Sequence, residues 1–252
     1  MSDPILLHVE DGLARITLNR PERLNAFNAD AARAWAGVTR EATSRDDVGA
    51  IILDAAGRSF CAGGDVRDMA ETMGSGADIT ALAEVINQGI RSLTESAIPV
   101  VAAAQGTTAG GGLGILMASD YAIVGANSKI GSLYANIGLT PDLSVTAQLA
   151  RAVGERRALQ LVLHDRMLSA DEALAWGLVA EVAAGDAVGA RANEIAQFWL
   201  SGASGAYGQA KRLIRSQPTR SVADQLSEEA RSIGAAFDTP EAQARIRAFG
   251  AR

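Results

Sequence analysis

Cysteine is the scarcest residue in this sequence: Cys61 is the single one among 252 residues. A lone cysteine excludes any disulfide within the chain. Because this usage fits a reducing compartment, we expect a cytoplasmic protein. Histidine is nearly as scarce, with only His8 and His164. We expect no metal site.

Long runs of one residue kind are also missing. No basic cluster interrupts a chain with a formal net charge of −6, which argues against nucleic acid as a partner. No uninterrupted apolar stretch is long enough to span a membrane. Residues 1–10 do not show the charged-then-apolar pattern of a secretion signal. We therefore expect neither nucleic acid nor a membrane among the binding partners.

The chain is rich in small apolar residues. Hydrophobic residues make up 48% of it and aromatic residues only 4%, which favours close packing of helices and strands. Short apolar runs predict strands at 5–9, 13–18, 50–53, 100–104 and 121–124. Helical patterns lie between most of these runs, so the sequence predicts βαβ units in a mostly parallel sheet and an α/β fold.

The second half of the chain is mostly helical. From residue 144 onward only 178–182 is predicted as a strand, and helical patterns extend to about residue 248. We place a domain boundary near residue 190. Residues 1–190 are predicted to form the core, and 191–252 a helical region that needs a partner surface.

Two glycine-rich turns, each after a predicted buried strand, carry most of the functional information. They are Phe60-Cys61-Ala62-Gly63-Gly64-Asp65 and Ala109-Gly110-Gly111-Gly112-Leu113-Gly114. The backbone N–H groups of two such turns are able to meet over one carbonyl oxygen and stabilise an enolate or a tetrahedral oxyanion. Glycine allows this close approach because it has no Cβ. The pair of turns indicates thioester chemistry.

Five segments, through their order and spacing, give the chain a resemblance to a known family. They are residues 15–26, 60–65, 99–120, 137–141 and 170–179. Together they resemble the enoyl-CoA hydratase/isomerase (crotonase) superfamily over nearly the whole length. The resemblance implies a spiral of ββα units followed by a C-terminal helical trimerisation region. It also implies a homotrimer or a dimer of trimers.

The resemblance further implies an acyl-CoA substrate and a set of site residues. Coenzyme A would enter as the thioester carrier of the substrate, with no permanently bound cofactor. Carried over by motif position, the oxyanion hole lies at the amides of Gly64 and Gly111. Substrate and CoA contacts fall to Arg23, Ala26, Ala62, Gly63, Asp65, Val66, Gly110 and Tyr134, although for Tyr134 simple packing is an equally good interpretation. Lys211, Phe237 and Arg252 are weaker candidates for CoA contacts.

The carboxylates depart from the family pattern. A family hydratase holds its water between two glutamates, and the matching positions here are Gly114 and Tyr134. Hydration needs a base for the water and an acid for the α-carbon. Because these two residues do not supply that pair at neutral pH, the sequence argues against hydratase activity.

Asp142 is the acid that remains in this neighbourhood, at a position where some family isomerases carry their one catalytic carboxylate. A single base is sufficient to move a proton from C2 to C4 of a 3-enoyl thioester, while the oxyanion hole holds the dienolate. Apolar walls would raise the pKa of this carboxyl group. The competing interpretation is that Asp142 caps the next helix, unless Ser144 does so.

Three other functions stay open beside the isomerase. The first is an enoyl-CoA hydratase. The second is a CoA-thioester dehalogenase or hydrolase-like member with Asp142 as nucleophile, for which the family's histidine base is missing. The third is a non-catalytic acyl-CoA-binding member. Cys61 is expected to be a packing residue and Asp65 a helix cap.

Overall fold

A six-stranded sheet is the centre of the computed structural model, which describes residues 3–164 and 166–251. Its strand order is β1-β2-β3-β4-β6-β9. The first pair is an antiparallel hairpin turned at Asp11 and Gly12, and the other pairs are parallel. This confirms the predicted α/β class. The strands are β1 (Ile5–Glu10), β2 (Leu13–Leu18), β3 (Ala50–Ala55), β4 (Val100–Ala104), β6 (Tyr121–Gly125) and β9 (Glu181–Ala183).

Both faces of this sheet are buried at the parallel strands β3, β4 and β6, as is typical of such strands. Because side chains alternate along a strand, β3 sends Ile51 and Leu53 into the larger core cluster and Ala50 and Ile52 into a smaller one. Helices α1 (Ala29–Ser44) and α3 (Gly76–Glu95) pack together and contribute to the larger cluster. Helix α8 (Val188–Ser201) contributes to the smaller one.

A second, three-stranded sheet builds the expected ββα spiral. It contains β5 (Thr107–Ala109), β7 (Lys129–Gly131) and β8 (Leu168–Ser169), in the order β5-β7-β8. Strands β4 and β5 lead directly into helix α4 (Gly111–Met117), and β6 and β7 lead into the 3₁₀ helix η2 (Tyr134–Ile137). Each of these ββα units therefore contributes one strand to the six-stranded sheet and one to the three-stranded sheet.

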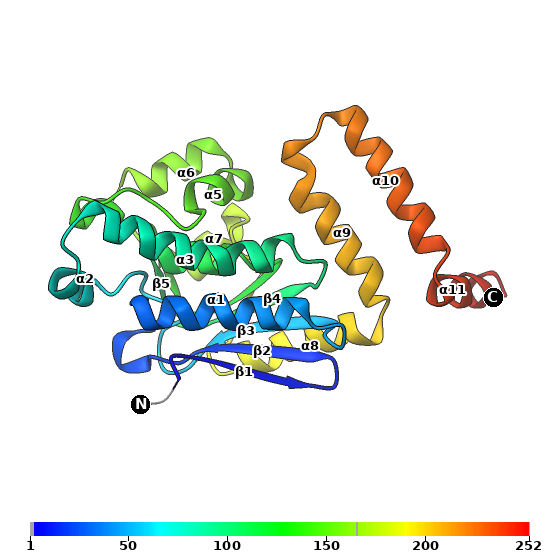
Figure 1. Cartoon of the computed structure of the whole chain (residues 1–252), viewed down its shortest axis with the longest axis horizontal. Helices are drawn as coiled ribbons and strands as arrows, with labels where there is room; N and C mark the ends of the chain where they lie inside the picture. The colour runs from blue at the N-terminus through cyan, green and yellow to red at the C-terminus, as the bar shows by residue number, and fades with distance from the viewer. Residues whose placement is uncertain (1–2, 165, 252) are drawn as a thin grey trace.

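The C-terminal helices extend away from the body. Helix α9 (Ser204–Ser216) touches α3, while α10 (Val222–Phe237) and α11 (Pro240–Gly250) stand apart at the end of the molecule (Figure 1). The expected boundary at residue 190 falls within α8. Among the described residues no helix is long and apolar enough to cross a membrane. The remaining helices are η1 (Pro21–Arg23), α2 (Val66–Thr72), α5 (Val145–Val153), α6 (Glu155–Val162), α7 (Ala170–Trp176) and η3 (Gln217–Thr219).

The predicted strand at 178–182 is wrong in most of its length, because β9 begins only at Glu181. Helix α7 ends at Gly177, which has a left-handed φ of 77°. The Leu178 amide then turns back to donate to the Ala173 carbonyl at 2.9 Å. The apolar side chains of Leu178 and Val179 are buried by this helix ending, so their apolar character does not come from a strand.

Candidate active site

The loop before α1 supports the first glycine turn through Asn25, a buried side chain. Its Nδ2 donates to the carbonyls of Ala56 and Ser59, both at 2.9 Å, and its Oδ1 accepts the Arg20 amide at 2.8 Å. Because each polar atom of the Asn25 amide is bonded, the loop and the turn are held in one register. The residue itself adopts a left-handed φ of 56°.

The Gly64 amide is directed away from this supporting loop. The Phe27 amide donates to the Gly63 carbonyl at 2.8 Å, and the Asp65 amide donates to the Phe27 carbonyl at 2.9 Å. Since backbone groups alternate in direction along an extended strand, the N–H of the residue between them points to the opposite side. That side is lined by the second glycine turn.

The second turn brings the Gly111 amide next to the first turn. Gly110 precedes α4 with a φ of 52°, and Gly111 is the first helical residue, whose N–H has no acceptor within the helix. A Cβ placed on Gly63 would lie 3.0 Å from the Gly111 nitrogen. The two turns therefore touch, and both Gly64 and Gly111 line one cavity.

Gly114 has a different task, because it makes room for the segment that carries Asp142. A Cβ at this position would lie 2.0 Å from the Leu143 carbonyl oxygen, and one at Gly111 would lie 2.6 Å from Leu143 Cδ1. Leu143 and Ser144 both adopt left-handed φ angles, of 48° and 65°. Backbone thus occupies the space where a side chain at position 114 would begin.

The cavity above the two turns has a volume of about 500 Å³ and mostly apolar walls. Helix α3 forms one wall, and it is anchored to α1 by the Trp35 indole N–H, which donates to the Ile86 carbonyl at 3.1 Å. Its volume is in the range of small-molecule sites. The apolar lining residues are Ala62, Val66, Met69, Ile79, Leu82, Ala83, Ile86, Ala109, Leu133, Ile137, Leu139 and Leu143.

Asp142 and Tyr134 face each other across this lining. The Tyr134 hydroxyl donates to Asp142 Oδ1 at 2.6 Å, and both side chains are half-buried. Asp142 does not cap α5: the residue before the helix is Ser144, which makes no side-chain cap bond either. The expectation of a capping aspartate therefore fails, and one carboxylate oxygen remains free of the tyrosine.

Burial raises the pKa of Asp142 above its usual value, and the hydrogen bond from Tyr134 opposes that shift. The pKa of Tyr134 is also raised, first by burial and then by the neighbouring carboxylate. The phenol therefore stays protonated and acts as a donor. Glu84 also lines the cavity, but it is exposed and lies 3.8 Å from Arg91.

A second hollow of about 500 Å³ lies on the far side of Gly64 and Val66, which line both spaces. Arg23, Arg58 and Arg67 surround it, and all three are exposed. Within the described residues none of these three arginines takes part in an ion pair. The second hollow is therefore mainly cationic, although Glu22 and the Arg20-paired Asp65 also line it.

Most of the residues singled out in the sequence lie on one of these two spaces. Ala62, Gly64, Val66, Gly110, Gly111, Tyr134 and Asp142 line the apolar cavity, and Arg23, Ala26, Gly64, Asp65 and Val66 line the cationic hollow. Gly63 lies between the turns. Sequence reasoning missed Arg58 and Arg67, although both flank the first glycine motif. The α3 wall carries no motif, but it lies within the helical residues 66–90 that are expected to build the acyl pocket.

Asp65 and Cys61 have structural tasks. Asp65 is buried, caps α2 by accepting the Asp68 amide at 3.3 Å, and pairs with Arg20 at 3.1 Å, as expected for a cap. Cys61 is fully buried, and burial raises the pKa of its thiol to about 12. A thiol with so high a pKa is not a nucleophile at neutral pH, which supports the packing interpretation.

Lys211 is engaged within its own chain. Its ammonium donates to the carbonyls of Leu93 and Ile98 at 2.7 and 2.6 Å and lies 3.0 Å from Asp120. Only 7% of the residue is exposed. Its contact with CoA, at a site that a neighbouring subunit would complete, stays a prediction. Phe237 is exposed on α10. Arg252 lies outside the described residues.

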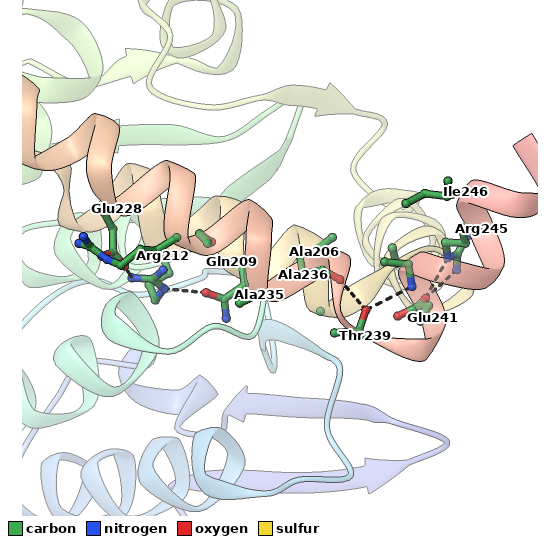
Figure 2. A pocket seen from close by; sticks show the side chains of 15 residues that line it. Ala206, Gln209, Arg212, Glu228, Ala235, Ala236, Thr239, Glu241, Arg245 and Ile246 are labelled. Atoms are coloured by element: carbon green, nitrogen blue, oxygen red, sulfur yellow. Dashed lines mark hydrogen bonds and ion pairs between the residues drawn. The ribbon is translucent and has the colours of Figure 1, made fainter. Parts of the chain in front are cut away.

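A larger cavity, of about 820 Å³, lies between α9, α10 and α11 (Figure 2). Alanine and glycine make up much of its wall. Both carboxylates that line it are bound to arginines: Glu228 to Arg212 at 2.7 Å, and Glu241 to Arg245 at 2.9 Å. Without a free acid or a glycine turn, this space lacks the chemistry of the apolar cavity.

A ββα spiral with two touching glycine turns at one apolar cavity defines the crotonase class of α/β enzymes. The sequence pattern of the enoyl-CoA hydratase/isomerase family matches residues 8–251. The chain therefore belongs to the enoyl-CoA hydratase/isomerase family, and it is an enzyme of that superfamily.

Relatives in this family carry different activities. The chain is 32% identical over 231 residues to the 1,2-epoxyphenylacetyl-CoA isomerase of Escherichia coli, covering 91% of this chain and 88% of that protein. It is 33% identical over 246 residues to the short-chain-enoyl-CoA hydratase of Clostridium acetobutylicum, covering 97% and 94%. A crystal structure of an enoyl-CoA hydratase from Polaromonas sp. JS666 superposes with a TM-score of 0.91 at 25% identity, covering 98% and 97%.

Proposed function

We propose that this protein is an enoyl-CoA isomerase that uses Asp142 as its single acid and base. The observation that carries the proposal is the position of this carboxylate. It lies in the apolar cavity that also holds Gly64 and Gly111, with one oxygen not engaged by Tyr134. Burial raises its pKa, which brings a carboxyl group closer to the range useful for proton transfer.

The reaction follows from this arrangement in two proton transfers. Asp142 removes a proton from C2 of a 3-enoyl thioester, and the electron pair of the C–H bond moves toward the thioester carbonyl. The amides of Gly64 and Gly111 hold the negative oxygen of the dienolate. The electrons then return, the double bond forms between C2 and C3, and C4 takes the proton back from Asp142.

The segment that carries Asp142 and Leu143 also disfavours hydration. A glutamate at position 114 would have to pass through the Leu143 carbonyl, since even a Cβ there would lie 2.0 Å from its oxygen. Tyr134, at the other hydratase position, is a protonated donor because its pKa is raised. Dehalogenation is disfavoured as well, because His8 and His164 are exposed and neither lines the cavity.

The substrate is proposed to be an acyl-CoA thioester with an uncharged, apolar acyl group. The acyl cavity has apolar walls, and its charged lining residues, Glu84 and Asp142, are both acidic among the described residues. A carboxylate at the end of the acyl chain would be buried there without a cation to pair with. The phosphates of CoA would lie at Arg23, Arg58 and Arg67, beyond Gly64.

Incubation with matched 3-enoyl-CoA and 2-enoyl-CoA thioesters tests the proposal. We expect the 3-enoyl substrate to give the 2-enoyl isomer, because Asp142 supplies the one base that isomerisation needs. Product analysis by chromatography and mass spectrometry distinguishes the outcomes. A 3-hydroxyacyl product would identify a hydratase instead. Binding of both thioesters without turnover would identify a non-catalytic member.

The same assay with an acyl-pantetheine thioester separates CoA recognition from chemistry. This substrate lacks the nucleotide phosphates, so its KM is expected to rise about tenfold or more while kcat changes little. The KM for the CoA substrate should rise with salt, because the arginines are exposed. Equal KM values for the two thioesters would contradict the arginine assignment.

We also propose that the C-terminal helices bind further copies of the chain, in a homotrimer or a dimer of trimers. Helices α10 and α11 stand apart from the body and expose large apolar side chains that a neighbouring copy would cover. Those residues are Val222, Leu226, Ile233, Phe237, Ile246 and Phe249. Sedimentation equilibrium is expected to give three or six times the mass of 26.1 kDa. A monomeric mass would contradict this proposal.

A further inference from the structure

We propose that Tyr134 is a positioning residue, whose hydroxyl fixes the Asp142 carboxylate so that one oxygen serves both proton transfers. The inference rests on the proposed isomerase function and goes beyond it. The sequence leaves two interpretations of Tyr134, as a residue that lines the acyl pocket or as one that simply packs. In the structure its hydroxyl instead donates to Asp142 Oδ1 at 2.6 Å.

The backbone holds Tyr134 in place for this bond. Leu133, just before it, has a left-handed φ of 54°, and η2 ends at Gly138 with a φ of 73°. This short 3₁₀ helix sets the tyrosine on the cavity wall opposite Asp142. On the other side of the pair, Leu143 is wedged against Gly111 and Gly114. The Asp142 side of the pair is therefore held by tightly packed backbone, and the Tyr134 side is fixed by the left-handed residues at the two ends of η2.

The other titratable groups near the pair leave Tyr134 as the one that is bonded to the acid. Cys61 is the weakest of the groups that raise the pKa of Tyr134. Burial raises the pKa of the Cys61 thiol itself to about 12, so the thiol stays neutral. Glu84 reaches the cavity from α3, where it is exposed and near Arg91. Within the described lining, the phenol is thus the side-chain donor to this carboxylate, beside a bond from the backbone of Asp142 itself.

A fixed carboxylate matters because the isomerase uses one proton twice. The C2 proton binds to the free oxygen, Oδ2, while Tyr134 remains bonded to Oδ1. If the group were free to rotate, the proton would be carried away from the dienolate and exchange with water. The hydroxyl also stabilises the charged carboxylate more than the neutral acid, and so lowers the pKa of Asp142 against the effect of burial.

Tyr134→Phe tests this role. Besides kcat, it changes two measurements that a merely structural residue would not move: the pH profile and the transfer of protium. We expect kcat to fall about 10- to 100-fold, as for loss of a hydrogen bond to a charged group. The acid limb of the kcat/KM profile should move to higher pH, by about one unit. When a 3-enoyl-CoA that carries protium at C2 is converted in D₂O, the fraction of product whose C2 protium has been transferred to C4 should fall.

Tyr121→Phe is the matched control. It removes a second tyrosine–carboxylate bond, from Tyr121 to Glu181 at 2.7 Å, at the edge of the sheet and outside the cavity. Both the pH profile and the protium retention should match those of the wild type. If Tyr134→Phe also leaves both unchanged, Tyr134 does not position the acid and the inference is wrong.

If Tyr134→Phe does not fold, incorporation of fluorinated tyrosine at position 134 provides a second test. The chain has only three tyrosines, so Tyr121→Phe with Tyr207→Phe leaves Tyr134 as the single site of incorporation. A fluorinated phenol is a stronger donor, and the acid limb should therefore move to lower pH. An unchanged limb would overturn the inference. Failure of the proposed function is distinguishable, because it would show as a wild-type protein that does not isomerise, or as isomerisation that survives Asp142→Asn.

Discussion

Replacement of Asp142 by asparagine is expected to lower kcat of isomerisation about 1,000-fold, within the range that general acid–base catalysis contributes. The amide has a similar shape and its Oδ1 is able to accept the Tyr134 hydroxyl, so the cavity should keep its form. What it lacks is a lone pair basic enough to take the C2 proton. Steady-state kinetics with a 3-enoyl-CoA measure the effect, and wild-type turnover would contradict the assignment.

The same variant should not lose stability. Burial raises the pKa of Asp142 in the folded protein, so the charged carboxylate costs free energy of folding at neutral pH. That cost is present above the raised pKa and disappears as the pH falls below the ordinary value of about 4. Thermal unfolding of Asp142→Asn at pH 7 should therefore match or exceed the wild type, and any such gain should vanish in acid.

Glu84→Gln tests the competing carboxylate of the cavity. Glu84 lines the same space from α3, but it is exposed and lies near Arg91. Loss of isomerisation in this variant, together with retained activity in Asp142→Asn, would identify Glu84 on α3 as the base. The two variants together therefore identify the acid without relying on either one alone.

Replacement of Gly114 by alanine is expected to lower the free energy of unfolding by about 2–3 kcal/mol, the usual cost of overpacking a core. The new Cβ would lie 2.0 Å from the Leu143 carbonyl oxygen, which is backbone and yields only if its segment moves. Movement of Leu143 would also move Asp142, so kcat should fall with stability. Thermal unfolding and the isomerase assay measure the two effects.

Gly37→Ala is the matched control for this change. Gly37 lies inside helix α1, and a Cβ there would meet no atom within 4 Å. Alanine in an open helical position should stabilise the protein by about 0.5–1 kcal/mol and leave kcat unchanged. If Gly114→Ala behaves like Gly37→Ala, the close approach of Leu143 does not constrain the segment that carries Asp142.

The fold was largely predictable because its signals are local. Alternating and apolar runs identify the strands of the main sheet, and Asp11-Gly12 identifies the hairpin. The one wrong strand, at 178–182, arises because an apolar run after a helix has two explanations. Leu178 and Val179 are buried by the end of α7, and periodicity in so short a run does not distinguish this from a strand.

The site was predictable only where a motif marks it. The glycine turns and Asp142 belong to recognisable segments, and the structure brings all of them to one cavity. Arg58 and Arg67 flank a motif, but exposed arginines are common and nothing in their spacing singles them out. The bond from Tyr134 to Asp142 depends on three left-handed residues, at 133, 143 and 144, whose φ angles are unusual for their side chains.

The contact between Leu143 and Gly114 also limits how this enzyme is able to evolve. The two-glutamate arrangement would require a side chain at 114, which the Leu143 carbonyl blocks. Moving that carbonyl would displace Asp142 before any new acid could act. On the proposed mechanism, a single substitution at position 114 is therefore expected to reduce isomerisation without completing a hydratase site. Laboratory selection for hydration from this scaffold should succeed only when position 114 and residues 142–144 are varied together.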